Sequence, residues 1–254
     1  MYGLSDAQHR ASRRLIWYVR AQQSVTVIVL LPGMDGTGTL SAEFVTALQP
    51  EVEALVVSYP NDPALGYTEL ERIARSWLPA TRPFLILGES FSGPIAVSIA
   101  ATQPPGLVGV VLCGSFVRNP SPSLAWLHPL FNVVGGFVPS AVTNWFLLGR
   151  FSTDRLRSAL ARALAQVSAA TLRTRLAAVR AVDVSAQLAK LRVPVLYLRA
   201  TEDRIVPAPA SALVLRLLPS ASIIELEAPH SMLQASPAEA ARHVKEFAGR
   251  AVGP

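Results

Sequence analysis

Cysteine is almost absent from this chain of 254 residues, which contains only Cys113. A single cysteine excludes a disulfide framework within the chain and any cysteine-based metal cluster. No spacing of histidine and carboxylate residues suggests a metal site either, so we expect neither a metal nor a cofactor. Cys113 itself ends an apolar run, and we expect it to be a small buried hydrophobic residue.

Lysine is also scarce, and the net charge of +6 comes mainly from arginine. Seven arginines lie in residues 150–180, against one acidic residue, Asp154. Such a basic face either attracts anionic head groups and acidic substrates or is simply solvated. A peripheral contact with a membrane or lipid therefore stays open. Nucleic acid is not expected as a partner, because no recognised binding motif accompanies the charge.

The N-terminus lacks the long apolar core of a secretory signal. Residues 15–19 form a short apolar stretch between Arg14 and Arg20. This stretch is too short for a signal peptide, so we expect residence in the cytoplasm. Residues 1–24 are interpreted as an N-terminal extension, an amphipathic helix that docks on the domain or on a membrane surface.

The most informative stretch is residues 85–93, which read L-I-L-G-E-S-F-S-G. An apolar strand pattern ends there in a small-x-Ser-x-small turn, and an alanine-rich helix pattern follows with Pro94 in its first turn. Such a turn holds its central residue in a strained conformation that exposes the side chain, and it requires small neighbours. We therefore predict that Ser90 is a nucleophile, flanked by the small residues Gly88 and Ser92.

A serine hydroxyl needs a general base and a group that orients the base. Of the four histidines, only His230 follows a strand pattern and precedes a helix pattern in the C-terminal part. Asp203 follows another apolar strand, with Glu202 as its nearest competitor. Catalytic groups of parallel sheets gather at strand ends, so we predict a triad in the order Ser90, Asp203, His230. The alternatives are a surface histidine and a structural pair between Asp203 and Arg204.

The developing oxyanion requires two backbone N–H donors, one of them from the residue after the nucleophile. Phe91 occupies that position. The second donor is expected from the glycine-rich loop L-P-G-M-D-G-T-G, and we predict the Met34 amide. A phosphatase with an aspartate nucleophile does not fit, because Gly33 stands where that aspartate is needed. The glycine order also differs from the G-x-G-x-x-G of a dinucleotide-binding loop.

The chain resembles the α/β-hydrolase superfamily over about residues 25–250, in particular serine carboxylesterases and lipases. The resemblance lies in the turn at Ser90 (the nucleophile elbow), the glycine-rich loop that carries Met34 (the oxyanion loop), the late aspartate and the later histidine. The loop is similar to a subset of bacterial esterase-like hydrolases and to plastid ester-synthase-type acyltransferases. The resemblance implies acyl transfer through an acyl-serine intermediate from a small-molecule ester. The chain departs from the family at Ser92, where a second glycine is usual. It also has only 24 residues before Val25, so we expect the sheet to be shortened, without the two strands that often come first.

Six strand patterns alternate with helical stretches, which is typical of a parallel sheet covered on both faces. They lie at about residues 25–31, 53–58, 84–88, 108–113, 193–199 and 221–226. We expect one α/β domain, residues 25–250, with a mostly parallel sheet of about six strands in a shortened α/β-hydrolase fold. A helical lid is expected between the fourth and fifth strands, at about residues 117–185.

Residues 119–149 contain no charged side chain. The span is long enough to cross a bilayer, but four prolines and a pair of glycines break it, so a transmembrane helix is not expected. We interpret the span as a lid over Ser90 whose inner face lines an acyl pocket, and the alternative is additional core. The candidate substrate-binding residues are Trp126, Phe131 and Trp145.

The leading hypothesis is a serine hydrolase that cleaves carboxylic esters of apolar acyl groups. Short to medium acyl chains are expected because the lid is only moderately long. A second hypothesis keeps the acyl-serine intermediate but passes the acyl group to an alcohol or a lysolipid. A third is a non-catalytic binder of apolar ligands on the same scaffold, against which the intact triad argues. The oligomeric state is not predicted.

Overall fold

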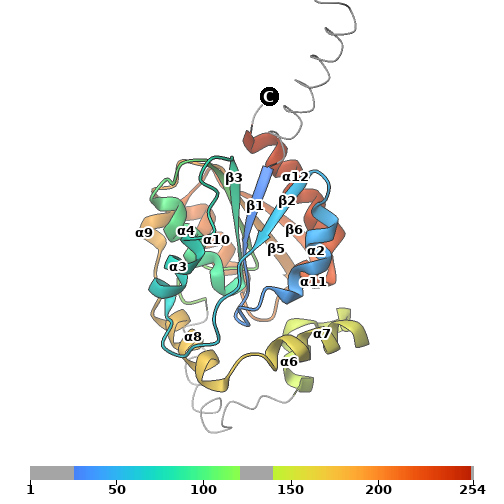
Figure 1. The fold of residues 1–254 in the computed structure, drawn as a ribbon. Helices are drawn as coiled ribbons and strands as arrows, with labels where there is room; N and C mark the ends of the chain where they lie inside the picture. The colour runs from blue at the N-terminus through green and yellow to red at the C-terminus, as the bar shows by residue number, and fades with distance from the viewer. Residues whose placement is uncertain (1–25, 121–139, 253–254) are drawn as a thin grey trace, which may run out of the picture.

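The computed structural model describes residues 26–120 and 140–252. It contains a sheet of six parallel strands in the order β2-β1-β3-β4-β5-β6 (Figure 1). The strands are β1 (Thr26–Leu31), β2 (Val52–Val56), β3 (Phe84–Glu89), β4 (Leu107–Cys113), β5 (Val195–Glu202) and β6 (Ser222–Pro229). Each predicted strand is confirmed to within a few residues, and so is the parallel sheet of about six strands.

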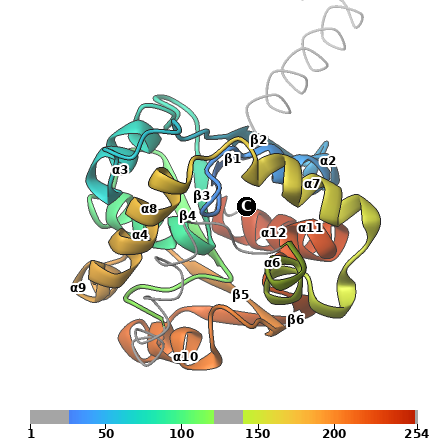
Figure 2. The ribbon, with the colours of Figure 1, turned by 90° about the horizontal axis from the view of Figure 1, so that it is seen from below.

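Helices cover both faces of the sheet (Figures 1 and 2). One face carries α3 (Tyr67–Arg75), α4 (Gly93–Ala101), α9 (Ser185–Leu188) and α10 (Ala208–Leu217). The other carries α2 (Ala42–Leu48), α11 (Met232–Ala235) and α12 (Pro237–Val252). The strands are consequently apolar on both sides, as buried parallel strands require.

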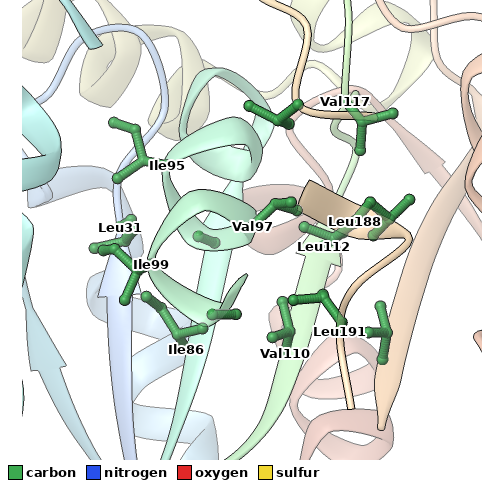
Figure 3. Packing of buried hydrophobic residues seen from close by; sticks show 14 of the residues in the cluster. Leu31, Ile86, Ile95, Val97, Ile99, Val110, Leu112, Val117, Leu188 and Leu191 are labelled. Carbon is green, nitrogen blue, oxygen red and sulfur yellow. The ribbon is translucent and has the colours of Figure 1, made fainter. Parts of the chain in front are cut away.

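Alternate residues of each strand belong to different cores, because successive side chains point to opposite faces. In β3, Ile86 packs in the cluster that includes α4, whereas Leu85 packs in the cluster that includes α2 and α12. Figure 3 shows Ile99 of α4 beside Leu31 and Ile86 of the sheet. Burial of each such side chain contributes about 1.5–3 kcal/mol, so the two cores hold the strand ends in fixed positions.

A helical insertion joins β4 to β5, as predicted. It contains α6 (Ser140–Leu147), α7 (Asp154–Leu164) and α8 (Ala169–Ala181), followed by α9. Figure 1 shows α6, α7 and α8 together beyond one end of the sheet. The two ends of the insertion meet at its base. There the backbones of Arg118 and Asp183 form an antiparallel β-bridge, and the Val184 N–H donates to the Val117 carbonyl at 2.7 Å.

Two predicted segments lie outside the described residues. These are the N-terminal extension, residues 1–24, and the part of the insertion at residues 121–139 that contains Trp126 and Phe131. In the described ranges, we find no helix with the length and apolar character needed to cross a bilayer.

Candidate active site

Ser90 lies at the sharp turn between β3 and α4. Its φ of 46° is in the left-handed region, which a non-glycine residue rarely adopts and which costs about 1–3 kcal/mol. The Ser90 carbonyl accepts a hydrogen bond from the Ser115 hydroxyl at 2.6 Å. Ser115 is held in turn by the Tyr197 hydroxyl, which donates to the Ser115 carbonyl at 2.5 Å. The surrounding residues thus stabilise the strained conformation expected of a nucleophile elbow.

Two glycines let the strand and the helix come this close together. A Cβ atom on Gly88 would lie 2.7 Å from the Cα of Gly93 and from the carbonyl oxygen of Ser92. A Cβ atom on Gly93 would overlap the side chain of Ser115. Both positions therefore exclude any larger residue without a shift of the backbone or of Ser115.

The fold brings together Ser90, His230 and Asp203. Nε2 of His230 is 2.8 Å from Oγ of Ser90, and Nδ1 of His230 is 2.8 Å from Oδ2 of Asp203. The side chains of His230 and Asp203 are only 7% and 5% exposed. A neutral imidazole that donates its Nδ1 proton to the carboxylate leaves Nε2 free to accept the serine proton. The arrangement therefore has the geometry of a nucleophile with an oriented base.

Asp203 is fixed by the loop that follows β5. Its Oδ1 atom accepts hydrogen bonds from the backbone N–H groups of Ile205 and Val206, both at 2.8 Å. The same oxygen lies 3.0 Å from Nδ1 of His230. The carboxylate thus keeps its orientation toward the imidazole through contacts with its own loop.

Glu202, the competitor of Asp203 for the role of the acid, and Arg204, its alternative partner, both have other contacts. Glu202 pairs with Arg150 at 2.7 Å. Arg204 donates to the Trp145 carbonyl at 2.8 Å, and its guanidinium lies 4.6 Å from the centre of the Trp145 ring. The Trp145 side chain is 56% exposed. Its ring contacts Arg204 and Phe146, and its role in substrate binding stays a prediction.

The loop after β1 carries the predicted oxyanion donor Met34. The Gly36 N–H donates to the Gly33 carbonyl at 3.0 Å, so Met34 and Asp35 are the central residues of a turn. Among the described residues, no hydrogen bond uses the Met34 N–H. Phe91, the other predicted donor, directly follows Ser90. The roles of these two amides as oxyanion donors stay predictions.

Ser92 ties this loop to the elbow, a role that the sequence did not indicate. Its hydroxyl donates to the Pro32 carbonyl and lies 3.1 Å from the Tyr59 hydroxyl. Both side chains are buried. The only signal in the sequence was the departure from glycine at position 92, because Pro32 and Tyr59 are distant along the chain.

Glu89 places a second carboxyl beside the nucleophile, and the sequence did not point to it. Nε2 of Gln234 donates to its Oε1 at 3.0 Å. Burial raises the pKa of Glu89 from 4.5 to about 7; Asp35 acts in the same direction, whereas Gln234 and His230 oppose it. The site therefore contains an acid that titrates near neutral pH.

Comparison with known proteins agrees with this geometry. Residues 28–243 match the sequence model of the Alpha/beta hydrolase family. No curated protein sequence matches the chain. A lipase-esterase related protein from Clostridium acetobutylicum has a similar structure, with 13% identity, a TM-score of 0.75 and coverage of 87% of this chain and 94% of that chain.

Two further solved structures are similar. An esterase from Exiguobacterium antarcticum is 16% identical, with a TM-score of 0.75 and coverage of 89% of this chain and 92% of that chain. An enol-lactonase from Burkholderia xenovorans is 19% identical, with a TM-score of 0.74 and coverage of 88% and 91%. At such identities the likeness shows the fold alone, because one fold supports several chemistries.

Proposed function

Because the chain belongs to the Alpha/beta hydrolase family, we propose that it is a serine hydrolase that cleaves carboxylic esters of apolar acyl groups. The observation that carries the proposal is the 2.8 Å distance from Nε2 of His230 to Oγ of Ser90, with Asp203 2.8 Å from the other ring nitrogen. A strained, accessible serine with an oriented base is what nucleophilic acyl transfer requires.

Acylation begins when Ser90 Oγ attacks the ester carbonyl carbon while His230 Nε2 takes the hydroxyl proton. The carbonyl oxygen becomes an oxyanion, and the N–H groups of Met34 and Phe91 stabilise it. Asp203 keeps the imidazole in the correct tautomer and stabilises the imidazolium. The intermediate collapses, the bond to the alcohol oxygen breaks, and the alcohol leaves with the proton from His230.

Deacylation repeats the sequence with water as the nucleophile. His230 takes a proton from water as the water oxygen attacks the acyl carbon. The second tetrahedral intermediate collapses, Ser90 regains its proton from His230, and the carboxylic acid leaves. The same groups serve both halves of the reaction, so no further catalytic group is needed.

The preference for apolar acyl groups is supported by the insertion. Residues 119–149 contain no charged side chain. The end of α6 lies against the loop that carries the base, since the Ser231 N–H donates to the Leu147 carbonyl at 3.1 Å. The adjacent Leu148 is buried. Uncharged chain therefore reaches the neighbourhood of His230, where an acyl group attached to Ser90 would lie.

A series of p-nitrophenyl esters, from acetate to palmitate, tests the proposal. We expect the wild type to hydrolyse short and medium chains best, and Ser90→Ala to lower kcat by about 10⁵- to 10⁶-fold because the nucleophile is lost. Ser158→Ala, at an exposed position of α7, is the matched control and should keep wild-type kcat. Equal rates for the wild type and Ser90→Ala would refute the serine mechanism.

Two further measurements separate the alternatives. A fluorophosphonate should label the wild type and not Ser90→Ala, whereas failure to label the wild type would favour a non-catalytic binder. Product analysis with added alcohol acceptors should give free acid. Predominant transfer to the alcohol would instead indicate an acyltransferase that uses the same acyl-serine.

A further inference from the structure

Arg175 of α8 is the only buried arginine among the described residues, with 1% of its surface exposed. Arginine is almost never fully buried unless it is paired, because removing a charge from water is costly. Burial lowers the pKa of Arg175, and Asp35 and Tyr59 oppose that shift. The guanidinium nevertheless keeps its charge, as arginine does in proteins. Its burial at this place therefore needs an explanation.

The partners of Arg175 are backbone carbonyls of two loops. Nη1 donates to the carbonyl oxygens of Met34 at 2.8 Å and Asp35 at 2.9 Å, and Nη2 donates to Pro60 at 3.0 Å. It forms no ion pair with a carboxylate of the described residues. Its Nε atom is buried and lacks a partner there. The Arg175 side chain thus contacts the oxyanion loop although its buried charge is only partly compensated by these carbonyls.

The oxyanion loop is shaped to receive this guanidinium. Gly36 has a φ of +73°, and a Cβ atom on it would lie 2.5 Å from Nη1 and 2.9 Å from Nη2 of Arg175. A side chain at position 36 would therefore displace the guanidinium as well as strain the backbone. Glycine at this position and arginine at position 175 fit each other.

The contacts fix the part of the loop that the oxyanion needs. The ends of the loop are held elsewhere, since Ser92 donates to the Pro32 carbonyl and the Tyr59 N–H donates to the Gly36 carbonyl at 2.7 Å. Between these points, Nη1 of Arg175 holds two successive carbonyls, those of Met34 and Asp35. The Asp35 carbonyl shares its peptide with the Gly36 N–H, which donates to the Gly33 carbonyl at 3.0 Å. The Gly33 carbonyl in turn shares its peptide with the Met34 N–H, so Arg175 restrains the direction of that N–H through this turn.

Placement of α8 does not depend on Arg175 alone. Oγ1 of Thr171 donates to Oδ1 of Asn61 at 2.8 Å, and Oγ1 of Thr174 donates to the Pro63 carbonyl at 2.9 Å. These contacts dock the helix on the loop that follows β2. Loss of the guanidinium should therefore free the oxyanion loop while α8 stays in place.

We propose that Arg175 is a positioning residue for ester hydrolysis, which keeps the Met34 N–H directed at the oxyanion. The inference rests on the proposed function and joins the helical insertion to the chemistry at Ser90. An oxyanion donor acts mainly in the transition state, so its misplacement lowers kcat and leaves KM nearly unchanged.

The test compares Arg175→Met and Arg175→Lys with the wild type on p-nitrophenyl butyrate. We expect Arg175→Met to lower kcat by about 10²-fold, as loss or misplacement of an oxyanion donor does, with KM within about threefold. Arg175→Lys keeps the charge and should be intermediate, because one ammonium cannot reproduce the planar fork. In Arg175→Ala, added guanidinium at millimolar concentration should restore part of kcat, whereas sodium at equal ionic strength should not.

The control is Arg173→Met, which changes an exposed arginine of the same helix and should keep wild-type kcat. Wild-type kcat in Arg175→Met with a lower melting temperature would overturn the inference, because the role would then be structural only. If Arg175→Met does not fold, Arg175→Lys decides, and wild-type kcat there overturns the inference. A wild type that hydrolyses no ester would instead refute the proposed function, which separates the two failures.

Discussion

The carboxylate of Asp203 receives hydrogen bonds on both oxygens, and the donors differ. Backbone N–H groups of Ile205 and Val206 bind Oδ1, whereas Oδ2 is the oxygen closer to Nδ1 of His230. A carboxylate accepts at every position, so it satisfies all three donors at once. The site is therefore selective for a carboxylate over its isosteric amide.

We expect Asp203→Asn to lower kcat by about 10³- to 10⁴-fold. The two backbone N–H groups require an acceptor, so the amide oxygen must take the position of Oδ1 and the NH₂ group must face Nδ1 of His230. The imidazole then carries its proton on Nε2 and cannot accept the proton of Ser90. Initial rates on p-nitrophenyl butyrate measure the change.

Asp183→Asn is the matched control, since Asp183 lies at the base of the insertion, outside the triad, where its Oδ1 atom accepts a hydrogen bond from the Ser185 N–H at 2.9 Å. It should keep wild-type kcat. An Asp203→Asn protein within tenfold of the wild-type rate would show that Asp203 does not set the tautomer of His230.

The sequence predicted the residues of the triad because each follows a strand pattern whose end is visible in the chain. The raised pKa of Glu89 was not predictable in this way. It depends on burial and on Asp35, which lies on another strand-end loop. Glu89 was visible in the motif, but its pKa was not predictable, because the groups around it come together only in the folded chain.

The elbow and the loop after β1 form one structural unit through Ser92. Its hydroxyl donates to the Pro32 carbonyl and accepts from the Tyr59 hydroxyl, and all of these groups lie in the interior. A glycine at this position would leave two buried polar groups without a partner. The departure from the family pattern is therefore part of a hydrogen-bond network that joins the loop after β1, the loop after β2 and the turn before α4.

We expect Ser92→Ala to lower the free energy of unfolding by about 1–3 kcal/mol, because it leaves the Pro32 carbonyl and the Tyr59 hydroxyl unsatisfied. Ser92→Gly should be at least as destabilising, despite restoring the residue usual in the family, since glycine loses more entropy on folding. Urea denaturation followed by circular dichroism measures both. Ser98→Ala, on the following helix α4, is the control and should change stability little. A Ser92→Gly protein more stable than the wild type would contradict the role assigned to Ser92.

Strands were easier to predict than the faces of the insertion. Six apolar runs bounded by turn residues gave the strand positions, because a buried parallel strand must be apolar on both sides. Trp145 shows the limit. Its apolar character was evident, but its position against Arg204 depends on how α6 packs beside the loop after β5. The composition of α6 indicates that the helix is apolar, but it does not predict which residues the helix packs against.

Across the whole molecule, the site depends on contacts between distant parts of the chain. The separation is 140 residues from Ser90 to His230, 141 from Met34 to Arg175 and 145 from Glu89 to Gln234. The first was predictable because the topology of a parallel sheet places its strand ends at one edge. The contacts of Arg175 and Gln234 were not predictable, because they depend on how helices α8 and α11 pack against the rest of the domain, which the sequence pattern does not specify.

Stability of the whole molecule should depend on pH through Glu89. Burial raises its pKa from 4.5 to about 7, so the folded state binds this proton more tightly than the unfolded state does. The free energy of unfolding then falls as pH rises between those values and levels off above the higher one. This sign is opposite to that of a carboxylate stabilised by an ion pair, whose contribution is lost at low pH.

We expect Glu89→Gln to be more stable than the wild type above pH 7, and the advantage to vanish below pH 4.5. The amide avoids the cost of a buried charge and still offers Gln234 an acceptor. Urea denaturation across this range measures the difference. Glu239→Gln is the control, because Glu239 is exposed in the first turn of α12, where a negative charge is favourable by about 0.3–1 kcal/mol. Glu239→Gln should therefore lower the free energy of unfolding at high pH, whereas Glu89→Gln should raise it. If both variants changed the free energy of unfolding in the same direction above pH 7, a raised pKa at Glu89 would be contradicted.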